Sequence, residues 1–146
     1  MKKTARILDA NLNRSREGLR VVEDIVRFIL NDADLASRIK VIRHTVTSLV
    51  QQLPLSELEL LKARDSNGDV GMNLNCASED LRPDIPQVAS ANIHRAQEAM
   101  RVLEELSKLY SDDVPLQFKK LRFQIYELEK EITPKLMKCF TQNEQT

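Results

Sequence analysis

The sequence has few of the residues that build β-strands and tight turns. Its 146 residues include 3 glycines, 4 phenylalanines, 2 tyrosines and no tryptophan. Strands are enriched in aromatic side chains, and short hairpin turns depend on glycine. The hydrophobic fraction of 42% and the charged fraction of 30% are ordinary for a soluble helical protein. The composition therefore predicts an all-α protein, and the length fits a single domain.

The sequence also lacks an excess of charge and a long apolar run. Its 22 basic and 22 acidic residues cancel, so no overall attraction to nucleic acid or to an anionic membrane is expected. No apolar stretch approaches the roughly 20 residues of a membrane span. The basic residues near the N-terminus precede no apolar run of the kind that signal peptides contain. We therefore expect a cytoplasmic protein with no nucleic-acid partner and no membrane partner.

Cysteine is scarce too. Cys76 and Cys139 belong to no CxxC pair, and no cluster of histidines lies near either of them. Disulfide frameworks and zinc sites need closely spaced ligands. Free thiols in a reducing compartment are therefore the favoured interpretation, and a disulfide or metal role is the alternative.

The sequence contains an internal repeat. Residues 10–24 read ANLNRSREGLRVVED, and residues 91–105 read ANIHRAQEAMRVLEE. A duplicated helix usually preserves apolar packing residues while its exposed face changes. Here most of the identities are polar, which is a first indication of chemistry. They are Asn11/Asn92, Arg14/Arg95, Glu17/Glu98, Arg20/Arg101 and Glu23/Glu104.

Apolar residues spaced three and four apart predict two helical hairpins. The first hairpin has helices at about 4–30 and 35–53, with Asp34 as the expected N-cap of the second helix. Pro54 ends the second helix, and a short third helix follows with Ser56 as its expected N-cap. The second hairpin has helices at about 87–111 and 115–132, and Pro134 is expected to bend or end the last helix. The duplication includes the second helices, where Arg43 aligns with Arg122.

Two amphipathic hairpins that each expose an apolar side should pack face to face. We therefore expect a pseudo-twofold four-helix bundle made of tandem-duplicated helical hairpins. The expected division is one helical domain over residues 1–140 with a polar tail at 141–146. Within it lie a first repeat at 5–53, a long loop at 64–86 and a second repeat at 87–132. Loops of this length in compact domains are usually either functional or disordered.

The repeated polar residues allow two interpretations. At 100° per residue, Asn11 and Arg14 flank Gly18 beside the buried face of the first helix, which leaves room for a bound group. Glu17, Arg20 and Glu23 are placed on the far side, paired with Arg14 and with one another at spacings of three. These charges are either solvated helix pairs or arginines arranged to bind phosphate.

Two further features carry candidate residues. In the loop, Asp65 and Asp69 lie around an Asn-Gly turn, which suits either Mg²⁺ bound beside phosphates or solvated carboxylates. The pattern is neither an EF-hand nor a Walker A loop. His44 follows Arg43. It is a general base, a hydrogen-bond donor to phosphate or a structural histidine.

The chain resembles a known family in five stretches. They read RILDANLNRSREGLRVVEDIVRFIL, IRH, KARDSNGDVG, ANIHRAQEAMRVLEELSKL and LRFQIYELEKEI. The family is the helical hydroxymethylpyrimidine-phosphate kinase of thiamine biosynthesis, a domain also found fused before thiamine-phosphate synthase. The resemblance implies ATP-dependent conversion of 4-amino-5-hydroxymethyl-2-methylpyrimidine phosphate to its diphosphate. It does not imply synthase activity, since 146 residues cannot hold the (β/α)₈ barrel of that enzyme.

The resemblance also implies roles, with Mg²⁺ as cofactor and ATP and the phosphorylated pyrimidine as small-molecule partners. Arg14, Arg20, Arg95 and Arg101 would share the phosphates, and Asp65 and Asp69, with Glu17 or Glu98, would carry the metal. Asn11 and Asn92 would bind the aminopyrimidine, and Arg43, His44, Arg64 and Gly71 are further binding candidates. Which repeat binds which ligand stays open, as does a homodimer. The alternatives are a module that captures a phosphorylated precursor for a separate synthase, and a purely structural bundle.

Overall fold

The structure is a computed structural model that describes residues 2–74 and 81–143. Within these ranges it contains helices and no strands, which confirms the prediction of an all-α protein. The helices are α1 (Lys2–Phe28), α2 (Ala33–Gln51), α3 (Glu57–Ala63), α5 (Ile85–Ser107) and α6 (Val114–Asn143).

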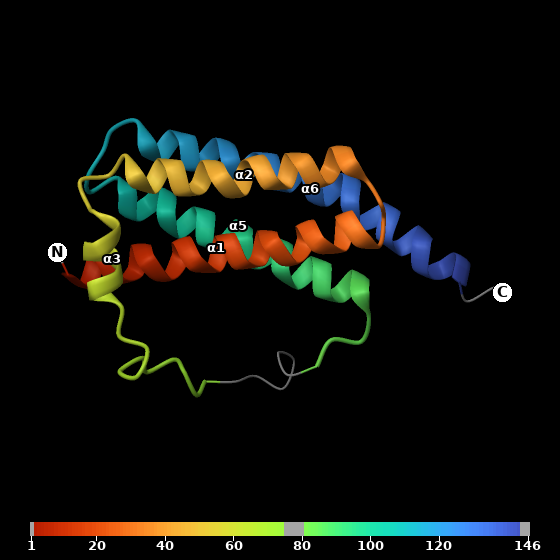
Figure 1. Ribbon diagram of the computed structural model, residues 1–146, viewed down its shortest axis with the longest axis horizontal. Coiled ribbons are helices and arrows are strands. Elements are labelled where there is room, and N and C mark those ends of the chain that lie inside the picture. Colours follow the sequence, from red (N-terminus) through yellow and green to blue (C-terminus); the bar gives the residue numbers. More distant parts are fainter. Residues whose placement is uncertain (1, 75–80, 144–146) are drawn as a thin grey trace.

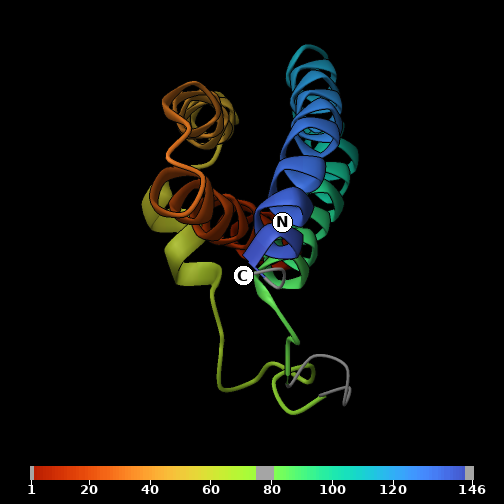
Figure 2. The same ribbon diagram turned by 90° about the vertical axis from the view of Figure 1, so that its right-hand side faces the viewer.

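The helices form two antiparallel hairpins that lie side by side. The first hairpin consists of α1 and α2, and the second consists of α5 and α6 (Figure 1). Helices α1 and α5 pack against each other along one layer, while α2 and α6 form the other layer with fewer contacts between them (Figure 2). Helix α3 packs on the side of α1 that faces away from the second hairpin. The predicted bundle of duplicated hairpins is confirmed.

The core follows the apolar spacing of the sequence. In α1 the expected inner positions are buried from Leu8 to Val26, and Ser15 among them is fully buried. In α5 the smaller inner set, from Ala89 to Ser107, is buried as well. Because the apolar stripes of all four long helices face inward, one continuous core joins the two hairpins.

Helix starts differ from the expectation at two places. Asp32, rather than Asp34, caps α2, and its carboxylate accepts the Leu35 N–H at 3.0 Å. Helix α5 begins at Ile85 instead of residue 87, because Asp84 accepts the Gln87 N–H at 2.8 Å. In both cases the aspartate lies three residues before the amide that it caps, which is the N-cap geometry. The Ser56 cap of α3 is confirmed, with a reciprocal bond from Glu59.

Helix α6 continues through Pro134, so the expected end of the helix near residue 132 is wrong, whereas a bend at Pro134 stays a prediction. The helix extends to Asn143, which brings residues of the expected polar tail into it. A proline inside a helix costs about 3 kcal/mol. Buried side chains on both sides, Ile132 and Leu136, offset that cost by anchoring the two halves in the same core.

The two hairpins approach each other closely at Gly18. A methyl group on Gly18 would lie 2.9 Å from the backbone oxygen of Asn92 and 3.7 Å from the nitrogen of Ala96. The place that the sequence suggests for a bound group is therefore filled by the backbone of α5. Gly18 is needed for helix packing.

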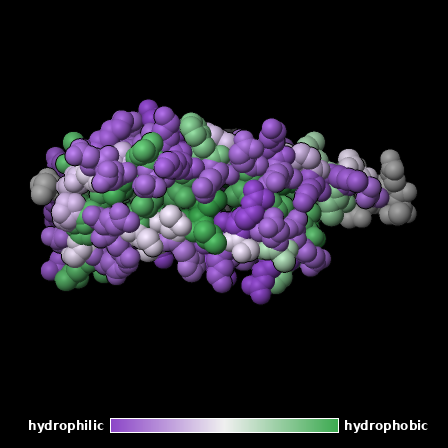
Figure 3. All heavy atoms as spheres, turned by 90° about the horizontal axis from the view of Figure 1, so that it is seen from above, coloured by the Kyte–Doolittle hydropathy of each residue, from purple (hydrophilic) through white to green (hydrophobic). Residues whose placement is uncertain are grey.

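The opposite layer leaves apolar surface exposed. A shallow groove between α2 and α6 includes Val41, Ile42 and Leu128. Seen from above, apolar side chains form a broken strip along the middle of this side (Figure 3). Such a strip suits association, and a homodimer stays a prediction.

The structure also bears on the expectations for the cysteines and for membrane-spanning helices. Cys139 forms no disulfide within the described ranges, whereas Cys76 lies outside the described residues. Among residues 2–74 and 81–143, no helix has the length and apolar character needed to cross a membrane.

Candidate functional site

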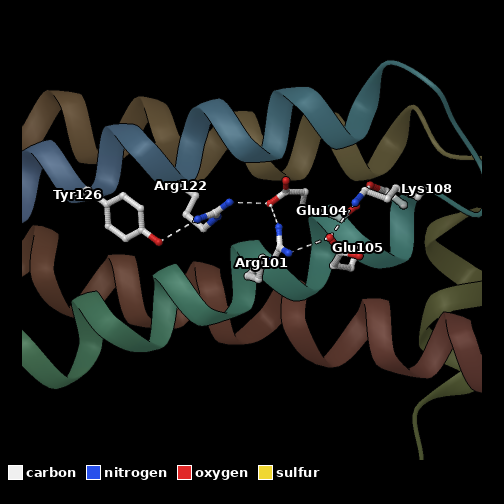
Figure 4. A network of polar contacts seen from close by, with 7 residues as sticks. Arg101, Glu104, Glu105, Lys108, Arg122 and Tyr126 are labelled. Atoms are coloured by element: carbon white, nitrogen blue, oxygen red, sulfur yellow. Dashed lines mark hydrogen bonds and ion pairs between the residues drawn. The ribbon is translucent and has the colours of Figure 1, made fainter.

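The repeated glutamates join the two helices of each hairpin. Arg43 of α2 donates from Nε to Glu23 Oε2 at 3.0 Å, and Arg122 of α6 donates from Nη2 to Glu104 Oε2 at 2.9 Å (Figure 4). The Glu23 and Glu104 side chains are only 8% and 7% exposed. The placement of Glu23 on the far side of its helix is therefore wrong, because it faces α2. An ion pair between helices explains why both members occur twice.

The neighbouring repeated arginines support the same pairs. Nη1 of Arg20 lies 4.0 Å from Oε2 of Glu23, and its Nε lies 3.4 Å from Oδ1 of Asp24. Arg101 lies 3.3 Å from Glu104 and 3.2 Å from Glu105. No ion pair joins Glu17 to Arg14 or Arg20 among the described residues, so that part of the predicted ladder is absent. Part of the polar repetition is thus structural.

The repeated asparagines bond to their own helices. Asn11 Nδ2 donates to the Ile7 carbonyl at 2.9 Å, and Asn92 Nδ2 donates to the Val88 carbonyl at 2.8 Å. Asn11 is only 4% exposed, and on the helical wheel it lies about 20° from Gly18, the residue that meets α5. Neither asparagine lines the pockets described below, so their proposed pyrimidine contacts stay a prediction.

The other repeated charges are exposed. Arg14, Glu17, Arg95 and Glu98 have no hydrogen-bond or ion-pair partner among residues 2–74 and 81–143. On the helical wheel Arg14 lies about 180° from Glu23, and therefore on the side of α1 opposite α2. Arg16 lies only about 20° from Glu23. The first helix thus presents cations on two separate sides.

A groove runs along the outer side of the first hairpin and consists of three adjoining pockets. The largest has a volume of about 570 Å³ and lies between α1, α2 and α3. The others, of about 380 and 410 Å³, lie between α1 and α2. Arg16 lines all three, and Asp9 to Arg20 spans about 16 Å along α1. We call this feature the first-hairpin groove, and its volumes suit a small-molecule ligand.

One end of the groove combines apolar with polar side chains, and we call it the α3 end. Leu12, Val50 and Leu60 line it together with the polar side chains of Asn13 and others. At its margin, Arg64 donates to both oxygens of Asp9, at 2.8 and 3.0 Å. The Asp9 carboxylate raises the pKa of Arg64, so this guanidinium stays charged. The ion pair fixes the start of the long loop against α1.

The other end of the groove is cationic, and we call it the arginine end. It is lined by Asn13, Arg16, Glu17, Arg20, Arg43, His44, Thr47 and Ser48. Arg43 bonds to Glu23 through Nε alone, which leaves its two terminal nitrogens without a partner among the described residues. Arg16 has no such partner at all. Two guanidinium groups that share a pocket and keep free donors are suited to a phosphate group.

The long loop begins beside this groove, and two of its own carboxylates accept hydrogen bonds from its glycines. Arg6 donates to the backbone oxygen of Asp65 at 2.8 Å. Asp65 and Asp69 accept the N–H groups of Gly68 and Gly71 at 2.9 and 2.8 Å. No group of three potential metal ligands occurs in the described part of the chain. Each carboxylate keeps a second oxygen, so Mg²⁺ would fit only with phosphates and water completing its ligands.

The structure thus sorts the predicted residues. The first-hairpin groove brings together Glu17, Arg20, Arg43, His44 and Arg64. Its pockets do not include Asn11, Arg14, Asp65, Asp69, Gly71, Asn92, Arg95, Glu98 or Arg101. Sequence reasoning missed Asn13, Arg16, Thr47 and Ser48. Selection by repetition excluded Asn13 and Arg16, because His94 and Gln97 replace them in the second repeat. Their difference between the repeats was the available signal.

Fold and groove together define a duplicated helical-hairpin domain with a cationic cleft of small-molecule size. The ThiD2 family matches residues 6–131, and the chain belongs to that family.

Curated relatives place the domain in a larger context. Over 124 residues the chain is 46% identical to a thiamine-phosphate synthase of Nostoc punctiforme, covering 85% of the chain and 34% of that protein. It is 45% identical to the Synechocystis thiamine-phosphate synthase, covering 86% of the chain and 35% of the relative. It is 39% identical to the one from Rhodopirellula baltica, covering 90% and 34%. The chain therefore spans about a third of these relatives, which link it to thiamine biosynthesis. No solved structure is significantly similar.

Proposed function

We propose that this domain binds the phosphorylated pyrimidine precursor of thiamine in the first-hairpin groove and phosphorylates it from ATP. An oxygen of the acceptor phosphate attacks the γ-phosphorus of ATP, and the bond between that phosphorus and the β-phosphate oxygen breaks. The products are the pyrimidine diphosphate and ADP. The family membership and the relatives support a role in thiamine biosynthesis. The phosphoryl transfer is our proposal.

One observation carries the proposal, namely the free guanidinium donors at the arginine end. Arg16 and Arg43 line one pocket with His44, Thr47 and Ser48, and Arg43 bonds to Glu23 through Nε alone. Phosphoryl transfer asks the protein mainly to align two ligands and to neutralise charge. A phosphate acceptor needs little deprotonation, so a dedicated base is not required. Arginines and hydroxyl groups suit this task.

The remaining elements of the proposal lie outside the pockets of the groove. Mg²⁺ would be bound by ligand phosphates together with the free oxygens of Asp65 and Asp69, and it would neutralise phosphate charge. The exposed Arg14 and Arg95 would serve a second ligand near the interface of α1 with α5. The loop that carries both aspartates starts at Arg64, which lines the α3 end.

A second function is favoured by a different observation. The relatives are named thiamine-phosphate synthases, and no group of three metal ligands lies in the described part of this chain. A module that binds a phosphorylated precursor for the synthase, without turnover, would account for both. Such a module would use the same cationic groove.

An assay with the purified chain separates the two functions. The protein is incubated with ATP, Mg²⁺ and the pyrimidine monophosphate, and pyrimidine diphosphate and ADP are measured together. Equal amounts of both products are expected. Tight binding of the monophosphate without products would reject the kinase and support the capture module. Binding of neither ligand would leave only a structural role.

A further inference from the structure

The two hairpins differ at the positions that form the groove. The first helices align with an offset of 81 residues, so Asn13 and Arg16 correspond to His94 and Gln97. The second helices align with an offset of 79, so His44 corresponds to Phe123 and Val50 to Glu129. These differences decide which hairpin can accept an anion.

In the second hairpin the equivalent positions bond to one another. Glu129 lies 2.7 Å from His94 Nε2 and accepts from Gln97 Nε2 at 3.1 Å. Arg122 uses both terminal nitrogens, one on Glu104 and the other on the Tyr126 hydroxyl at 3.0 Å (Figure 4). Its Nε is buried without a partner. This hairpin therefore presents a carboxylate and occupied donors to any anion.

In the first hairpin the same positions are open. Val50 replaces the glutamate, and Asn13 and Arg16 have no hydrogen-bond partner among the described residues. Arg43 binds its glutamate through Nε, so the terminal nitrogens that Arg122 has committed remain available. Asn13 and Arg16 both line the α3 end and the arginine end. They are about one helical turn apart, so both can contact one ligand in the groove.

We propose that the groove of the first hairpin, and not the equivalent positions of the second hairpin, binds a phosphorylated amino-heterocycle, with Asn13 on the ring and Arg16 on the phosphate. This inference rests on the proposed function, to which it adds the roles of Asn13 and Arg16 and a stoichiometry of one pyrimidine monophosphate per chain. The Asn13 amide offers a donor and an acceptor, which match an exocyclic amine and its neighbouring ring nitrogen. Arg16 and Arg43 match the phosphate oxygens. A 4-aminopyrimidine phosphate and an adenosine phosphate share this chemistry.

Binding is measured by calorimetry with the full chain, using four probes. These are the pyrimidine monophosphate, the unphosphorylated pyrimidine, AMP and inorganic phosphate. One pyrimidine monophosphate per chain is expected. Arg16→Gln, which copies the second hairpin, should weaken its binding at least tenfold while changing binding of the unphosphorylated pyrimidine less than twofold. Asn13→Ala should weaken both pyrimidines at least fivefold and leave inorganic phosphate unchanged.

Matched controls remove the same groups elsewhere. Lys40→Gln removes one positive charge from α2 outside the groove, and Gln117→Ala removes an exposed amide from α6. Both should bind like the unmodified chain. If the Asn13 and Arg16 variants weaken the binding of AMP, the groove binds the nucleotide. If they weaken the binding of the pyrimidine monophosphate, the groove binds the phosphoryl acceptor.

The inference would be overturned by two equal sites per chain, by unchanged affinity in both variants, or by no binding of any probe. Failure of the proposed kinase function is a separate result. It would appear as intact binding with the predicted variant effects and no formation of ADP.

Discussion

Arg43 donates to Glu23 through Nε at 3.0 Å, whereas its counterpart Arg122 reaches Glu104 through Nη2 at 2.9 Å. The same ion pair is therefore made with opposite ends of the guanidinium group. In the first hairpin the terminal nitrogens stay available to the groove. In the second they are engaged, one of them by Tyr126. Duplication preserved the structural contact and allowed only one copy to keep free donors.

Removing the buried glutamate of the second hairpin should destabilise the fold. In Glu104→Ala, Arg122 would keep its charge, 13% exposed, without its carboxylate. Leaving a largely buried charge unpaired costs about 3 kcal/mol. Urea unfolding at neutral pH measures the loss. Glu105→Ala is the control, because its side chain is 42% exposed and its pairs contribute little. Equal effects of the two variants would contradict a structural role for Glu104.

Adding a methyl group at Gly18 should also destabilise the protein. Alanine would gain about 1 kcal/mol of helix propensity, but its Cβ would lie 2.9 Å from the Asn92 backbone oxygen. Overpacking of this kind costs about 1–3 kcal/mol. We expect a lower unfolding midpoint for Gly18→Ala. Gly71→Ala is the control, since a methyl group at this exposed loop position would come no closer than 3.3 Å to Oδ1 of Asp69. A more stable Gly18→Ala variant would show that α1 and α5 can separate without cost.

The exposed repeated arginines give a prediction that separates activity from stability. Arg14→Ala and Arg95→Ala should each reduce diphosphate formation at least tenfold. Because neither residue has a partner among the described residues, the unfolding midpoint should stay unchanged. Turnover and urea unfolding are measured on the same preparations. Normal turnover in both variants would restrict the reaction to the first-hairpin groove.

Acid should remove the contribution of Asp32 to stability. The Leu35 N–H and then Lys135, 3.0 Å away, lower the pKa of Asp32 below that of a free aspartate. A lowered folded pKa stabilises the protein above the unfolded pKa, and this contribution is lost as the pH falls through the folded value. Asp32→Ala should therefore lower stability more at pH 7 than near about pH 2, in urea unfolding at both pH values. Equal losses would mean that the carboxylate charge is irrelevant.

The sequence by itself determined the helical class, the two hairpins and most of the core. Spacings of three and four apolar residues specify the buried face of each helix directly, as from Leu8 to Val26. The Ser56 cap could be read from the chain because its partner, Glu59, is three residues away. Such features depend on neighbours in sequence, and local chemistry is enough to predict them.

Tertiary structure decided the rest, since those features depend on residues far apart in the chain. Glu23 is buried because α2 brings Arg43 to it, and α6 passes Pro134 because Leu136 is anchored in the core. The repeated segment identified important residues, but repetition could not separate a paired guanidinium from a free one. Only the packing of α1 with α2 and α3 assembles Asn13, Arg16 and Arg43 around one groove. Local periodicity specifies which face of a helix is buried, while contacts between helices specify which charges remain free to bind a ligand.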